Sequence, residues 1–113
     1  MSDSRFREIW EESPDGQFLC ALINGDRGWL MCLRSANDPG FSSRNPEPVK
    51  RISKMIEYRL NNGQVDEYPS SWSYPVNIVE EALQFFRDHG VPPPFIRWHN
   101  DSEDGVVLDH GCT

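Results

Sequence analysis

Residues 74–98 read YPVNIVEEALQFFRDHGVPPPFIRW, and this stretch decides the fold. Six of its apolar side chains recur at the spacing i, i+1, i+4, i+5, i+7 and i+8, which places them on one face of an α-helix. Pro75 can open such a helix, Gly90 can close it with a positive φ angle, and the prolines after Gly90 cannot continue it. We therefore predict a helix over about residues 76–89 whose apolar face belongs to the core: Ile78, Val79, Ala82, Leu83, Phe85 and Phe86.

A helix with this much apolar surface needs a sheet to cover, and the rest of the chain contains strand-like segments. Turn signals at Asn24-Gly25 and at Asn61-Asn62-Gly63 separate two pairs of them and predict two hairpins. Residues 34–48 are rich in Ser, Asn, Pro and Gly and predict a long loop, either a connector or a binding segment. We expect strands over 17–23, 28–33, 54–60, 64–68 and 95–98, a strand or a helical turn over 5–12, and a last strand over 106–108.

The predicted fold class is therefore α+β, a small antiparallel sheet of about four to six strands built from hairpins and packed on one main helix. A chain of 113 residues suits a single domain, residues 1–113. No apolar run approaches the roughly 18 residues of a membrane span. The first 13 residues, MSDSRFREIWEES, are polar and have no apolar signal core, so we expect a cytoplasmic protein.

The net charge of −7 is unevenly distributed along the chain. Residues 1–56 carry eight Lys or Arg and eight Asp or Glu, whereas residues 57–113 carry three Arg and ten Asp or Glu. Such an acidic half repels nucleic-acid phosphates and favours a basic protein partner, although acidity also serves solubility alone. We expect no direct contact with nucleic acid.

The chain lacks a recognisable catalytic motif, which favours a binding protein over an enzyme. Cys20 and Cys32 lie in apolar segments where a thiol is unreactive, and three cysteines do not make a disulfide framework. A metal site from His99, His110 and Cys112 is a minor alternative, because only one short ligand pair is present. We expect neither a metal nor a cofactor.

Two blocks resemble a known family. One is IEYRLNNGQVDEYP, residues 56–69, and the other is the helix and strand of residues 74–98 with its His-Gly-x-Pro sequence. In their order and spacing they resemble the first numbered family of immunity proteins of bacterial polymorphic toxin systems, Imm-one. Three successive prolines stand at residues 92–94 where the family pattern has one.

The resemblance implies a protein that binds and neutralises a cognate toxin domain inside the producing cell. The toxin is expected to attack nucleic acid, as a deaminase or nuclease, and so to have a basic substrate cleft that an acidic surface can occlude. Aromatic side chains are favoured at the centre of such contacts. The predicted partner-binding residues are Asp66, Glu67, Trp72, Asp101, Glu103, Asp104 and, from the long loop, Phe41.

Two other interpretations stay open at this point. The chain could be a small metal-binding or enzymatic domain that uses His99, His110 and Cys112, or an adaptor for another basic protein. Bound zinc would favour the metal-binding or enzymatic interpretation, and a toxin gene next to this one would favour immunity.

Overall fold

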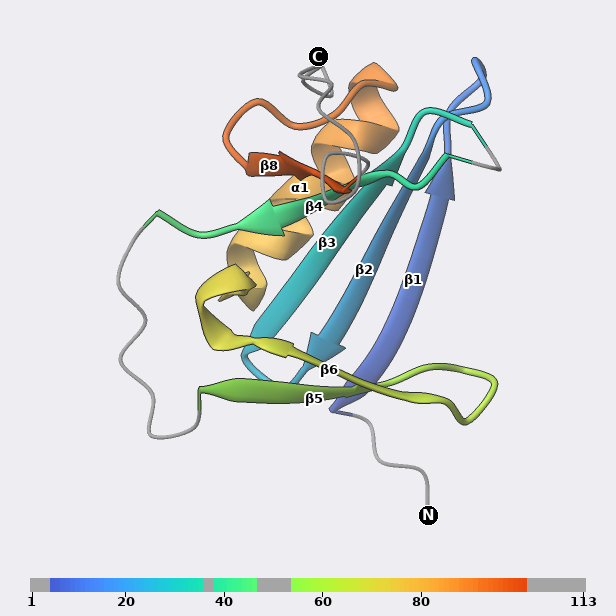
Figure 1. Cartoon of the computed structure of the whole chain (residues 1–113). Helices are drawn as coiled ribbons and strands as arrows, with labels where there is room; N and C mark the ends of the chain where they lie inside the picture. The colour runs from blue at the N-terminus through green and yellow to red at the C-terminus, as the bar shows by residue number, and fades with distance from the viewer. Residues whose placement is uncertain (1–4, 36–37, 47–53, 102–113) are drawn as a thin grey trace.

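The computed structural model describes residues 5–35, 38–46 and 54–101. Within these ranges the chain forms strands, one α-helix and one 3₁₀ turn, as Figure 1 shows. In chain order they are β1 Phe6–Glu12, β2 Phe18–Asn24, β3 Arg27–Leu33, β4 Phe41–Arg44, β5 Met55–Arg59, β6 Val65–Pro69, the 3₁₀ turn η1 Ser70–Trp72, β7 Tyr74–Pro75, α1 Val76–His89 and β8 Arg97–Asn100.

The strands form two sheets. A six-stranded antiparallel sheet has the order β1-β2-β3-β4-β8, with the short β7 beside one end of β3, and β5 pairs only with β6. The helix lies on one face of the larger sheet, and β5 and β6 cross the lower ends of β1 to β3 (Figure 1). The fold class predicted from the sequence, α+β with one main helix over about residues 76–89, is confirmed.

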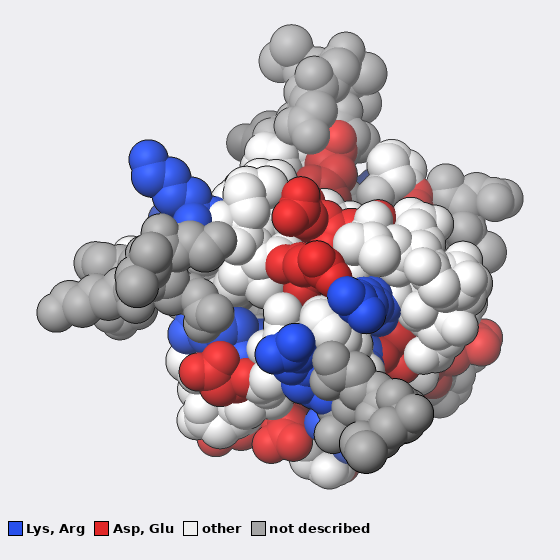
Figure 2. Space-filling model, turned by 90° about the horizontal axis from the view of Figure 1, so that it is seen from below, with Lys and Arg blue, Asp and Glu red and all other residues white. Residues whose placement is uncertain are grey.

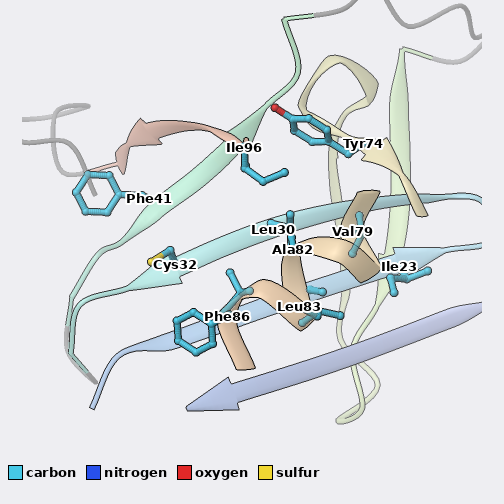
Figure 3. Packing of buried hydrophobic residues seen from close by; sticks show 12 residues of the cluster. Ile23, Leu30, Cys32, Phe41, Tyr74, Val79, Ala82, Leu83, Phe86 and Ile96 are labelled. Carbon is cyan, nitrogen blue, oxygen red and sulfur yellow. The ribbon is translucent and has the colours of Figure 1, made fainter. Parts of the chain in front are cut away.

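The main core lies between α1 and the larger sheet, where the side chains of α1 meet those of β2 and β3 (Figure 3). Val79, Ala82, Leu83 and Phe86 are at most 2% exposed. Gly90 ends the helix with φ of 69°, and its N–H donates to the carbonyl oxygen of Phe86. The prediction that Gly90 closes the helix is therefore confirmed.

A second, smaller core lies on the opposite face of the sheet, under β5 and β6. Because side chains alternate along a strand, Cys20, Leu22 and Trp29 point away from the helix and pack against Ile56 and Tyr58. The β5–β6 hairpin thus forms a third layer, which leaves part of this sheet face uncovered.

The predicted loop over residues 34–48 is wrong for Phe41–Arg44, which form the strand β4 between β3 and β8. Small hydroxyl side chains let this segment enter the sheet. The backbone N–H of Leu30 donates to Ser43 Oγ at 3.1 Å, so a serine satisfies a donor of β3. Phe41 and Ser43 are fully buried, which the turn-like composition of the segment did not indicate.

Two details of the helix and its strand also differ from the prediction. Phe85 was assigned to the core but is only partly buried. The final strand starts at Arg97, not Phe95, and the Phe95 side chain is 45% exposed. The expected strand at 106–108 lies outside the described residues.

Candidate functional site

Three of the predicted contact residues, Asp66, Trp72 and Asp101, lie where the β5–β6 hairpin meets β4 and the end of β8. We call this place the junction site and define it by Arg44, Asp66, Tyr68, Trp72 and Asp101. These residues come from β4, β6, η1 and the residue after β8, so the site exists only in the folded chain.

An aromatic stack forms the base of the junction site. The rings of Trp29 and Tyr68 are stacked with centroids 4.4 Å apart and planes 8° apart. Trp72 continues the stack, with its ring centroid 5.9 Å from that of Tyr68. Trp29 is 5% exposed, so the stack is anchored in the second core and its outer members have little freedom to move.

The backbone of η1 holds Trp72 in place. Its carbonyl oxygen accepts a hydrogen bond from Ser43 Oγ at 2.8 Å. The neighbouring Ser71 carbonyl accepts one from the N–H of Asn45 at 3.0 Å, and the Ser73 carbonyl accepts one from Asn45 Nδ2 at 2.9 Å. Trp72 is therefore positioned before any partner binds, which lowers the entropic cost of a contact.

Arg44 links the stack to the end of β8. Its guanidinium carbon lies 3.5 Å from the centroid of the Trp72 ring, a cation–π contact. Arg44 Nη1 also donates to Ser42 Oγ at 2.8 Å, and Ser42 Oγ donates to Asp101 Oδ1 at 2.8 Å. Arg44 Nη2 and Asp101 Oδ1 lie 4.0 Å apart, so the two opposite charges form a long ion pair at the end of β8.

Negative charge dominates around the Tyr68 hydroxyl. Burial, together with the nearby carboxylate of Asp66, raises the pKa of Tyr68 to about 12, with Asp101 a smaller contributor. Tyr68 therefore stays protonated at neutral pH, and its hydroxyl lies 3.4 Å from Asp66 Oδ2 as a donor. The site offers carboxylates and a phenol but no nucleophile with a lowered pKa.

The adjacent acids Asp66 and Glu67 lie on different faces of the hairpin. Asp66 points towards the sheet with Tyr68, whereas Glu67 points outwards and pairs in register with Glu57 of β5. Arg59 binds Glu57 at 2.8 Å and partly compensates these two like charges. Figure 2 shows the molecule from below, with acidic side chains gathered near the middle of this face and basic side chains beside them.

The remaining predicted contacts do not join the junction site. Phe41 is 0% exposed and packs in the main core, so its side chain has no surface to offer a partner. Glu103 and Asp104 lie outside the described residues. Arg44 and Tyr68, which the sequence did not single out, are central to the site. The sequence FSSR has a single apolar residue, so it offered no alternation that would predict a strand carrying Arg44.

Of the three candidate metal ligands, His99 lies within the described residues, and His110 and Cys112 lie outside them. Among residues 5–35, 38–46 and 54–101, no three His, Cys, Asp or Glu side chains are grouped so that they could hold a metal ion. Cys20 and Cys32 are buried as predicted, and burial raises the pKa of Cys20 to about 12, which makes its thiol unreactive. In the same part of the chain, no helix is long and apolar enough to cross a membrane.

Comparison with known protein families gives one match. The family model described as "Immunity protein Imm1" matches residues 6–100, from the first residue of β1 to the last of β8. The comparison with curated proteins gave no match, and neither did the comparison with solved structures.

Proposed function

We propose, from the premise that the chain belongs to the Imm1 family of immunity proteins, that its junction site binds the cognate toxin and blocks the toxin's substrate cleft. Membership in this family indicates an immunity protein against a bacterial toxin, and hence a protein partner. It also implies an inhibitor and not an enzyme. The finer steps below are our proposal.

One observation carries the choice of surface: Trp72 contacts both Tyr68 and Arg44. Tyr68 in turn contacts Asp66, and Arg44 lies near Asp101, so residues of β4, β6, η1 and the end of β8 form one connected group. A rigid aromatic base with charged groups at its rim is typical of binding hot spots, where most of the affinity is concentrated. Phe41, the other aromatic residue predicted as a contact, is buried in the core. Trp72 is therefore the aromatic contact that remains.

The charges of the site favour a basic toxin cleft. Asp66 and Asp101 contribute two carboxylates to the site beside the guanidinium of Arg44, and Glu67 adds a third carboxylate on the outer hairpin face. Arg97, the cross-strand partner of Arg44, adds a positive charge at the rim. A cleft that accepts nucleic-acid phosphates presents positive charge, so these carboxylates can occupy the positions of phosphates. We therefore propose a nucleic-acid-targeting toxin, such as a deaminase or nuclease, inhibited in the cytoplasm of the producing cell.

Arg44 has a second role in this proposal. It covers the Trp72 ring and lies near Asp101, so it holds the aromatic and acidic parts of the site in one arrangement. A single positive charge inside an acidic site also discriminates between toxins, because a cleft with a lysine at the facing position would be repelled.

The decisive experiment is co-expression with the toxin encoded by the neighbouring gene. Native protein should rescue growth and form a purifiable complex. Asp66→Asn combined with Asp101→Asn should slow association about tenfold at low salt and flatten its salt dependence. Asp15→Asn combined with Glu80→Gln is the matched control, because it removes the same charge from two exposed positions elsewhere.

Each result bears on a different part of the proposal. Failure of the native protein to rescue growth or to bind the toxin would refute toxin inhibition. Equal association rates for the site variant and the control variant would refute the junction site as the contact surface. Inhibition without competition between immunity protein and substrate would refute occlusion of the substrate cleft.

A further inference from the structure

A second surface with features of a contact site lies on the outer side of α1. It is a shallow hollow with a volume of about 430 Å³. Side chains from one stripe of the helix and from the loop before β8 line it: Glu81, Gln84, Phe85, Asp88, His89 and Phe95. We call it the outer hollow.

Two phenylalanines form the apolar part of the outer hollow. The rings of Phe85 and Phe95 meet edge to face, with centroids 5.9 Å apart and planes 87° apart. The Phe95 side chain remains 45% exposed, and Phe85 also contacts the His89 ring at 4.3 Å. A large aromatic side chain left half exposed beside another is more typical of a contact surface than of a core.

The ionisable side chains that line the outer hollow are Glu81, Asp88 and His89. Its lining includes Glu81 and Asp88 but neither Lys nor Arg. Asp88 accepts a hydrogen bond from Gln84 Nε2 at 3.0 Å, which fixes its carboxylate at the rim. Arg87, the nearest arginine in sequence, points to β1 and binds Glu11 at 2.8 Å, so it does not neutralise these acids.

We propose that the outer hollow is a second contact surface for the toxin and takes a basic side chain of the toxin from outside its substrate cleft. The aliphatic stem of a Lys or Arg would lie on the rings of Phe85 and Phe95, and its charged head would reach Glu81 and Asp88. This inference rests on the proposed function for the identity of the partner.

Charge excludes two other occupants. In a symmetric contact with a second copy of this chain, Glu81 and Asp88 would face the same carboxylates, which repel each other. An anionic lipid surface would be repelled in the same way. A basic protein surface is the occupant that complements both the aromatic rings and the acids.

One toxin can reach both surfaces by covering the edge strand β8. Phe95 lies just before β8 and Asp101 just after it, so their Cα atoms are at most about 22 Å apart. A contact area of about 800 Å² on each partner, usual for stable complexes, is wide enough to include Phe95 and Asp101. The two surfaces would then hold β8 between them.

Four variants test this inference with the purified toxin domain from the neighbouring gene. Phe95→Ala, and separately Glu81→Gln combined with Asp88→Asn, should each weaken binding about tenfold. Val91→Ala is the apolar control, because Val91 is also 45% exposed and does not line the hollow. Glu80→Gln is the charge control on the same helix. Thermal unfolding verifies that every variant is folded.

The outcomes separate this inference from the proposed function. Weaker binding by the Phe95 and acidic variants, with both controls unchanged, supports the second surface. Unchanged binding by those variants overturns it, while the proposed function stands if the Asp66 and Asp101 variant still slows association. Weaker binding by the outer-hollow variants, with an unchanged association rate for the Asp66 and Asp101 variant, would support this inference and refute the junction site as a contact surface.

Discussion

Replacing Phe41 by Ala tests whether this side chain belongs to the core, where the structure has it, or to a contact surface, where the sequence suggested it. The ring is fully buried between α1 and the sheet, and the Arg34 guanidinium lies 4.8 Å from its centroid. Truncating a buried Phe to Ala costs about 3–5 kcal/mol of unfolding free energy, from lost burial and the cavity left behind. For a domain of this size that corresponds to a fall in Tm of roughly 12–20 °C.

Phe95→Ala is the matched substitution, because it removes the same ring from a half-exposed position. Full burial of a Phe side chain contributes up to about 3 kcal/mol, so removing one that is 45% exposed should cost only about 1 kcal/mol. Urea unfolding followed by tryptophan fluorescence gives both free energies, and unchanged m-values would show that the comparison is valid.

The two substitutions should affect toxin affinity in the opposite order to stability, with the larger loss for Phe95→Ala. At a temperature where it is folded, the Phe41→Ala protein should keep its affinity, whereas Phe95→Ala should lose about tenfold, as proposed above. Equal destabilisation by the two substitutions would refute the core assignment of Phe41. Loss of affinity by a folded Phe41→Ala protein would restore this residue as a contact.

Two further predictions concern stability. Gly28→Ala would place a Cβ 2.8 Å from Val79 Cγ2 and 3.3 Å from the Leu22 carbonyl oxygen, so it should lower the free energy of unfolding in urea by about 1–3 kcal/mol. The double variant with Val79→Ala should lose less stability than the sum of the two single variants, because the shorter side chain removes the clash. Strictly additive losses would contradict the clash. A hydrogen bond from Arg34 lowers the pKa of Asp38 to about 2, so this carboxylate stabilises the fold above its unfolded pKa of about 4 and loses that contribution as the pH falls towards 2. Tm measured across this range should fall less steeply for Asp38→Asn than for the native protein, and parallel curves would disprove the contribution.

The periodic parts of the fold could be predicted from the sequence because their patterns are local. The helix over Val76–His89 has apolar residues at helical spacing and a glycine at its end, and both hairpins have asparagine-glycine turns. Such signals depend on neighbours within a few residues, so no knowledge of tertiary structure is needed to interpret them.

The strand β4 could not be predicted in this way. Its sequence, FSSR, has one apolar residue and follows proline and glycine, which is the composition of a loop. It becomes a strand because β3 and β8 supply hydrogen-bonding partners on both sides, and those partners are remote in sequence. Tertiary context thus decides its structure.

The same limit applies to the sites. Asp66, Trp72 and Asp101 were predicted as contacts on residue type and charge, but the meeting of Trp72 and Asp101 at Arg44 depends on the position of β4. Phe85 has the correct helical spacing for the core, yet it lies at the border of the apolar stripe, where it contacts Phe95 and not the sheet. Spacing alone gives the direction of a side chain and not what covers it.

The position of β4 between β3 and β8 has a consequence for biosynthesis. While the ribosome is still translating residues 97–101, β4 has a neighbour on one side only, and Arg44 has been made without Asp101. The sheet is therefore completed at β4 only after residues 97–100 have been synthesised, and the contact between Arg44 and Asp101 can form only then.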